Sequence, residues 1–305
     1  MTNEWYQLAK DRLDKIVPPI QSNFRVYAII TWVDDENTKT GWVSGTNSET
    51  AYIGGSICAE RAAAVQLREL PQSTRVTALY LISDLRNDCI TPGVLCREYL
   101  LSCMEPDIPI HLGNYDLNII RKTTLRQLYP YPSIYERVTR DDLLVKGKQL
   151  AEKHIPLNID EKWKRLYQEV HKVADKDQFG FQIHPITYAA GIQFQNGSIS
   201  VSWQKAGMEY GTTVDAVTGI LNDIGKNDKD NRPILLLMLD QFGLPHAPFA
   251  PARAQYYERS YSDIVVGVLD YDSGIFNETT IQELVPDCPK MCELWPSIAS
   301  SQGHL

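Results

Sequence analysis

Two short segments combine side chains that bind metals with a side chain that moves protons. The first is Cys58-Ala-Glu60, and the second is Pro92-Gly-Val-Leu-Cys96. Cysteine thiolates are preferred zinc ligands, and a catalytic zinc site keeps one position open for water. A glutamate beside such a site can act as a general acid and base. The segments therefore predict a hydrolytic Zn²⁺ site with Cys58 and Cys96 as metal ligands and Glu60 as the catalytic group.

Both segments lie where helices are expected to begin, and the positive end of a helix dipole favours a thiolate. Alanine-rich and amphipathic runs predict the helices, and runs of β-branched and aromatic residues predict the strands. The order strand, strand, helix, strand, helix is typical of a layered α/β domain. The expected elements are helices over 4–16, 59–70 and 95–104, and strands over 24–32, 41–45 and 76–83.

The chain repeats this order once. Pro92–Arg97 is matched by Pro248–Arg253 and Leu81–Asp84 by Leu237–Asp240, each 156 residues further on (248 − 92 and 237 − 81). A constant offset through unlike residues indicates duplication of one unit. The second copy is expected to contain helices over 161–174, 214–224 and 251–258, and strands over 186–194, 197–203 and 234–239. We predict domains over 1–130 and 159–286, a linker over 131–158 and a tail over 287–305.

The composition restricts the class of partner. Hydrophobic residues make up 43% and charged residues 22% of the 305 residues, as in ordinary globular proteins. The formal net charge of −8 argues against a nucleic acid and favours a small diffusible substrate. We expect a cytoplasmic protein with no membrane partner, because the first residues lack a secretory pattern and no apolar run approaches the ~20 residues of a membrane span. The six cysteines are expected to be free thiols.

Further segments extend the pattern around these residues. Ser22-Asn-Phe24-Arg-Val-Tyr-Ala28 opens the first expected strand, and Asn47-Ser-Glu49 ends nine residues before Cys58 (58 − 49). Arg61 and Arg97 complete Cys-Ala-Glu-Arg and Cys-Arg. In these segments the chain resembles the cytidine deaminases, in the form that carries an active N-terminal copy and a degenerate C-terminal copy. The resemblance implies a three-layer α/β/α cytidine deaminase-like fold with a mixed sheet, duplicated in one chain.

The resemblance also implies an activity and a substrate site. Glu60 would transfer protons from water to N3 of the base and to the leaving ammonia, Asn47 and Glu49 would hold the ribose hydroxyls, and Phe24 would pack on the pyrimidine. The implied reaction is zinc-dependent hydrolysis of cytidine or deoxycytidine to uridine or deoxyuridine, a step of pyrimidine salvage. The implied assembly is a homodimer.

One ligand position departs from the family pattern. The family has a third zinc thiolate where this chain has Gly93, and glycine has no side chain to offer a metal. Cys89, four residues upstream, is the nearest replacement, and Thr91 or a second water is a weaker one. The rival interpretation is therefore a pseudoenzyme that binds a nucleoside or supports a partner. Editing of bases within RNA is a third and weaker alternative, given the acidic composition.

Each candidate residue also has a purely structural interpretation. Asn47 and Glu49 could cap a turn, and Phe24 could be a core residue of its strand. Arg97 and Arg253 hold equivalent positions in both copies, which favours a structural role. The second copy lacks the metal and proton-transfer groups, because Asp215-Ala-Val217, Phe249 and Ala252 replace them. Cys288 and Cys292 resemble half of a metal site, although a lone pair of thiols is a weak signal.

Overall fold

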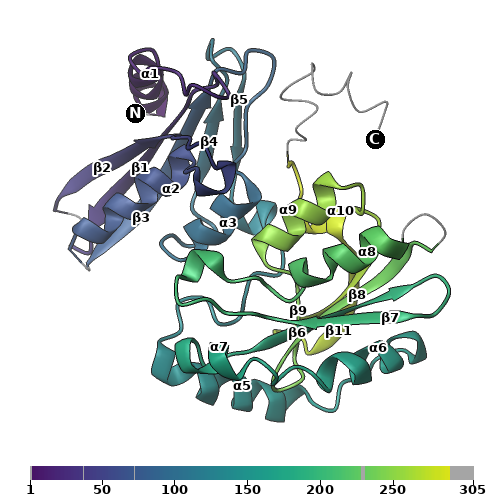
Figure 1. Ribbon diagram of the computed structural model, residues 1–305. Helices are drawn as coiled ribbons and strands as arrows, with labels where there is room; N and C mark the ends of the chain where they lie inside the picture. The colour runs from purple at the N-terminus through teal and green to yellow at the C-terminus, as the bar shows by residue number, and fades with distance from the viewer. Residues whose placement is uncertain (1, 37, 72, 228–230, 289–305) are drawn as a thin grey trace. The chain divides into compact units, whose positions relative to one another are not determined.

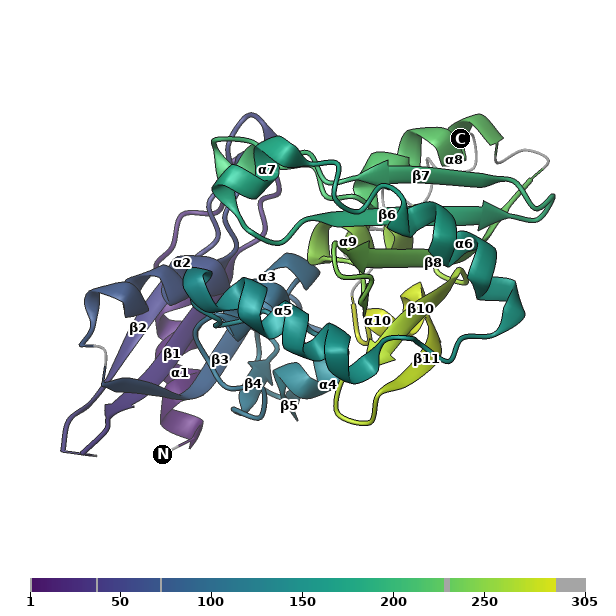
Figure 2. The ribbon, with the colours of Figure 1, turned by 90° about the horizontal axis from the view of Figure 1, so that it is seen from below.

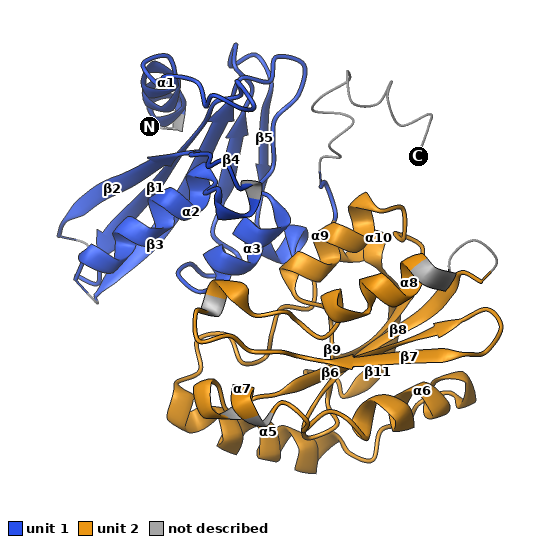
Figure 3. Cartoon of the chain, in the orientation of Figure 1, with its two compact units in different colours: residues 1–129, 286–305 blue, residues 130–285 orange. Residues whose placement is uncertain are grey.

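The computed structural model divides the chain into two units (Figure 1, Figure 3). It describes residues 2–36, 38–71, 73–227 and 231–288, so Cys292 lies outside the described residues. Unit 1 comprises Met1–Tyr129 with Pro286–Leu305, and unit 2 comprises Pro130–Val285. The segment 131–158, expected as a linker, is grouped with unit 2, and Asp287 and Cys288 of the expected tail are grouped with unit 1. Within the described ranges, no helix has the length and hydropathy that a membrane crossing requires.

Unit 1 is built on one five-stranded sheet with the order β2-β1-β3-β4-β5 (Figure 2). Strands β3 and β4 are parallel and the other neighbours are antiparallel, so the sheet is mixed. The elements are α1 (Thr2–Leu13), β1 (Val26–Asp34), β2 (Thr40–Thr46), α2 (Ala59–Gln66), β3 (Thr74–Ser83), α3 (Val94–Leu101), β4 (Ile110–Gly113), β5 (Ile120–Thr123) and α4 (Leu125–Leu128).

Helices cover both faces of this sheet. Alternate residues of a strand point to opposite faces, and Tyr27 and Ile29 of β1 pack with Tyr6 and Leu13 of α1. Helix α2 lies against β1 and β2 and beside α3 (Figure 1). Its close approach requires Gly45, because a Cβ atom there would lie 2.4 Å from the backbone nitrogen of Ala63. The three layers hold the starts of α2 and α3 side by side.

Unit 2 has the same arrangement. Its sheet has the order β11-β10-β8-β6-β7, with β9 paired to β8, and β8 and β10 are its parallel pair. Trp163, Leu166 and Val170 of α6 form the core with this sheet. The elements are α5 (Arg140–His154), α6 (Glu161–His171), α7 (Gln178–Ile183), β6 (Tyr188–Phe194), β7 (Ile199–Trp203), α8 (Leu221–Asn227), β8 (Pro233–Asp240), β9 (Pro245–His246), α9 (Ala250–Glu258), β10 (Val265–Asp270), β11 (Ile275–Thr280) and α10 (Ile281–Leu284).

The two sheets correspond strand by strand, β2-β1-β3-β4-β5 to β7-β6-β8-β10-β11, with the parallel pair in the same place. The predicted duplicated α/β fold with mixed sheets is therefore confirmed. One expected element differs, since the helix over 214–224 is replaced by a 3₁₀ turn at Thr218–Ile220 followed by α8. The Asp215 carboxylate accepts hydrogen bonds from the backbone of Val217 and Thr218, and Gly219 disfavours helix, so the helix begins later.

Candidate metal and catalytic site

Cys58 and Glu60 are held by the start of α2. Cys58 is the residue immediately before this helix, with extended backbone angles of φ −76° and ψ 156°. Glu60 lies in the first turn, and only 4% of its surface is exposed. The alanines at 62–64 favour helix from here onward and leave room for the sheet below. The fold therefore buries a carboxyl group beside a partly exposed thiol.

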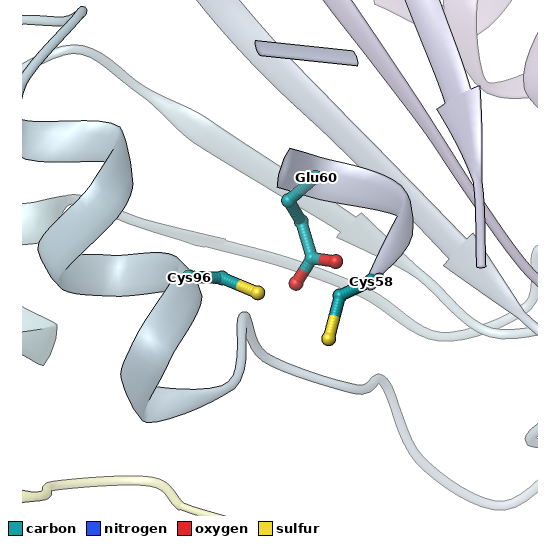
Figure 4. A group of neighbouring side chains, drawn as sticks. All are labelled: Cys58, Glu60 and Cys96. Atoms are coloured by element: carbon teal, nitrogen blue, oxygen red, sulfur yellow. The ribbon is translucent and has the colours of Figure 1, made fainter. Parts of the chain in front are cut away.

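Cys96 reaches the same place from the first turn of α3. This helix begins after Gly93, which has angles of φ −59° and ψ 156°, and the Cys96 side chain is completely buried. The ligand atoms of Cys58, Glu60 and Cys96 all lie within 4.8 Å of one another. Figure 4 shows the three side chains pointing toward one another from the two helices. The structure thus brings together the two expected thiolate ligands and the expected proton carrier.

The pKa values of the two thiols are shifted by their mutual hydrogen bond and by the nearby Arg61. A hydrogen bond with Cys96 is the largest cause that lowers the pKa of Cys58, and Arg61 lowers it further. The same bond, together with burial, raises the pKa of Cys96 well above its usual value. Arg61 donates to the Cys58 sulfur at 3.9 Å and to the Ser56 carbonyl at 3.2 Å. One thiolate therefore forms readily, and a cation is needed to hold both thiolates together.

Glu60 has the electrostatic character of a proton carrier. Burial, and then the charge on Cys58, raise its pKa to about 7. A carboxyl group that is partly protonated near neutral pH can both accept and donate a proton. Burial of Glu60 destabilises its charged form, and such strongly shifted pKa values are common at functional sites.

The residues present fit a zinc ion through two thiolates. The ligand atoms of this group lie within 4.8 Å of one another, and thiolate sulfurs are preferred ligands of zinc. Gly93 has no side chain to offer a metal, and a Cβ atom there would find no atom within 4 Å apart from those of its chain neighbours. That position is open space at the start of α3.

Cys89 does not lie in this group. Its buried thiol donates a hydrogen bond to the Ile119 carbonyl at 3.3 Å, and burial raises its pKa. It lines a separate cavity with Arg121 and Cys288. In the part of the chain that the structure describes, Cys58, Glu60 and Cys96 form the one group of this kind.

The expected sugar-binding residues lie together at the end of β2 and the approach to β1. Asn47 accepts a hydrogen bond from the Val26 amide at 2.9 Å and donates one to the Phe24 carbonyl at 2.8 Å. Glu49 accepts hydrogen bonds from the amide of Ser22 at 2.9 Å and from its hydroxyl. These contacts fix both side chains and the backbone of the half-buried Phe24, and they leave Asn47 one free N–H and one lone pair.

The equivalent place in unit 2 has lost this chemistry. The Asp215 carboxylate is used to cap the turn before α8, and it also accepts the hydroxyl of Thr218. The ring of Phe249, which stands where unit 1 has Gly93, packs edge-on against Tyr188 with centroids 4.9 Å apart. Among the described residues of unit 2, no three acidic, histidine or cysteine side chains meet at metal-binding distance.

No role was predicted for Arg61, and a structural role was predicted for Arg97 without its hydrogen-bond partners. Arg61 follows Cys58 by three residues, and on a helix this spacing places two residues on one face, so the signal was present. Arg97 uses acceptors far away in the chain, at Leu128 and Pro286, and no local pattern announces them.

Comparison with solved structures gives likenesses to cytidine deaminases. The sequence matches no protein-family model. A solved cytidine deaminase from Burkholderia pseudomallei is 23% identical with a TM-score of 0.37, and the alignment covers 44% of this chain and 99% of that chain. That from Mycobacterium tuberculosis is 17% identical with a TM-score of 0.35, covering 42% and 98%. That from Bacillus anthracis is 14% identical with a TM-score of 0.30, covering 46% and 93%. At this level none of them assigns a function to the chain.

The raised pKa of Glu60 predicts how stability depends on pH in the metal-free protein. The ordinary value is 4.5 and the folded-state value is about 7, so the stabilising contribution is complete below the ordinary value and is lost as pH rises through the folded-state value. Glu60→Gln removes this dependence and should gain up to roughly 3 kcal/mol over wild type between pH 5 and pH 8. Denaturant unfolding in a chelator at both pH values measures the difference. A difference that does not change with pH contradicts the assignment.

Proposed function

We propose that unit 1 is a zinc-dependent hydrolase that deaminates cytidine or deoxycytidine to uridine or deoxyuridine and ammonia. The observation that carries the proposal is the buried Glu60 carboxyl group, which faces two thiols at the starts of two adjacent helices. Hydrolysis at an amidine carbon removes two protons from water, and one of them must be delivered to the ring nitrogen and the other to the leaving amine. One carboxyl group with a pKa near neutrality can do both.

The chain's own residues divide the work as follows. Cys58 and Cys96 would hold Zn²⁺, which when bound acts as a Lewis acid and lowers the pKa of a water molecule. Glu60 would accept the two protons of the attacking water in turn, delivering one to N3, where the product keeps it, and the other to the departing amine. Asn47 and Glu49 would bind the ribose hydroxyls, and Phe24 would pack on the base. The hydrogen bonds that already fix Asn47 and Glu49 preorganise them for this role.

A second candidate function is favoured by Gly93. A site with two thiolates holds zinc less firmly than one with three, so the chain could bind a nucleoside, or support a partner, without turnover. Metal analysis of the purified protein, together with chromatography of cytidine incubated with it, separates the two. About one zinc per chain with uridine formed supports the hydrolase. If the protein contains no zinc and forms no uridine, the hydrolase proposal is overturned and the pseudoenzyme interpretation stands.

We also propose that the protein acts as a cytoplasmic homodimer with a nucleoside substrate. Each chain carries two copies of one fold unit, so a dimer with a two-fold axis would contain four copies. Sedimentation equilibrium at micromolar concentration is expected to give twice the chain mass. A monomer there contradicts the proposed assembly.

A further inference from the structure

The residue that follows Cys96 holds two distant parts of unit 1 together. Arg97 is completely buried, and each of its five N–H groups has an acceptor, none of them a carboxylate. The acceptors are the carbonyl of Pro92 (2.8 Å from Nε), the carbonyls of Leu128 (2.7 Å) and Pro286 (2.6 Å) from Nη1, and the Thr91 hydroxyl (3.1 Å) and Asp287 carbonyl (3.2 Å) from Nη2.

Apart from the Leu128 carbonyl at the end of α4, these acceptors fall into two groups. Thr91 and Pro92 belong to the loop that leads through Gly93 into α3, and this loop places Cys96. Pro286 and Asp287 belong to residues 286–288, which we call the strap and which belong to unit 1 although they follow α10. The Thr91 hydroxyl donates directly to the Asp287 carbonyl at 2.6 Å. Arg121 also holds the Asp287 carboxylate, at 3.0 Å.

Unit 2 contains the same device. Arg253 donates to the carbonyls of Pro248 (2.6 Å), Leu284 (3.2 Å), Pro130 (2.8 Å) and Tyr131 (2.9 Å), each 156 residues from its counterpart around Arg97 (248 − 92, 284 − 128, 286 − 130, 287 − 131). Asp287 and Tyr131 both have φ of 50°, a left-handed conformation that is rare outside glycine. In unit 2 the hydrogen bonds of Arg253 support the segment that contains Phe249 and Ala252, which bind no metal.

The geometry points to the strap as a positioning element for residues 91–96, which we call loop 91–96 and which carry the expected metal ligand Cys96. Its two carbonyl groups accept hydrogen bonds from Arg97 and Thr91 and so fix loop 91–96 with Cys96 facing Cys58. Without the strap, two buried guanidinium N–H groups and the Thr91 hydroxyl lose their acceptors, and buried polar groups do not stay unpaired. The loop must then rearrange. This inference rests on the proposed zinc site, and Arg97 and the strap act only through loop 91–96.

The test uses two substitutions at one residue. Asp287→Pro cannot adopt a positive φ, so it displaces the Asp287 carbonyl, whereas Asp287→Gly keeps that conformation. Both variants lose the contact with Arg121, which makes them a matched pair. We expect Asp287→Pro to weaken Co²⁺ binding by roughly 10- to 100-fold, the range for groups that orient metal ligands, and to reduce thiolate-to-cobalt absorption. Asp287→Gly should resemble wild type in both measurements. Equal affinity and spectra in the two variants overturn the inference.

A second readout does not depend on metal. In chelated protein, alkylation of Cys96 followed by peptide mass spectrometry should be severalfold faster in Asp287→Pro than in Asp287→Gly. If wild type binds no metal, the proposed zinc function fails while this comparison still decides whether the strap fixes Cys96. If Asp287→Pro does not fold, Arg97→Lys and Arg253→Lys replace it. Faster alkylation of Cys96 in Arg97→Lys alone supports the strap, and equal rates in the two variants overturn it.

Discussion

Glu60→Gln is expected to lower the turnover of cytidine by roughly 100- to 10,000-fold, the usual contribution of a positioned general acid and base. The amide has the shape of the carboxyl group and can still donate a hydrogen bond, but it cannot take a proton from water. Glu60 is 4% exposed, so bulk solvent cannot replace it as a base. The thiols of Cys58 and Cys96 are untouched, and zinc content should therefore remain that of wild type.

The measurement is kcat from uridine formation at saturating cytidine, with zinc determined on the same samples. Glu69→Gln is the matched control, because it makes the same chemical change at an exposed position just beyond α2. It should keep wild-type turnover. Near-wild-type kcat in Glu60→Gln would remove Glu60 from the mechanism. Loss of zinc in this variant would instead show that the carboxylate is a metal ligand.

The sequence predicted the features that depend on local residue patterns and on the repeat between the two copies. The offset of 156 residues between the two copies predicted two sheets with one connectivity, because each copy must bury its own apolar faces in the same way. Cys58 and Cys96 were predicted to share a metal because their two segments combine thiols with a glutamate, and each thiol lies where a helix is expected to begin. A helix over 214–224 was not formed, since the Asp215 carboxylate offered the backbone a competing turn.

The spacing of residues along the chain did not predict where side chains point or which distant residues they contact. Cys89 is four residues from Gly93, but the loop turns its thiol to the Ile119 carbonyl, which belongs to the approach to β5. The acceptors of Arg97 include Pro286, 189 residues along the chain. Hydrogen bonds from a side chain to such remote backbone carbonyls leave no trace in composition or periodicity, so only the folded chain connects the strap to loop 91–96.

Gly93→Cys is expected to tighten zinc binding by roughly a hundredfold. Structural zinc sites gain about 10–16 kcal/mol from four ligands, or roughly 3 kcal/mol for each, and that energy corresponds to about two factors of ten. The backbone at Gly93 has φ −59° and ψ 156°, which any residue can adopt, and a Cβ atom there meets no other atom within 4 Å. The added thiol therefore enters open space at the start of α3 without displacing Cys96.

Competition with a chromophoric chelator measures this change, and Gly93→Ala and Gly93→Ser are the controls, since a methyl group offers no ligand and a neutral hydroxyl offers a poor one. Cys89→Ser, made in both backgrounds, decides the remaining question. We expect it to leave zinc affinity unchanged, because its hydroxyl can still donate to the Ile119 carbonyl, whereas Cys96→Ser should release the metal. If Gly93→Cys adds nothing and Cys89→Ser loses zinc as fully as Cys96→Ser, then Cys89 is the third ligand and loop 89–93 moves when metal binds. If Gly93→Cys tightens binding and Cys89→Ser is without effect, the natural site holds its ion through two thiolates, and the missing third thiolate is the reason that it does so weakly.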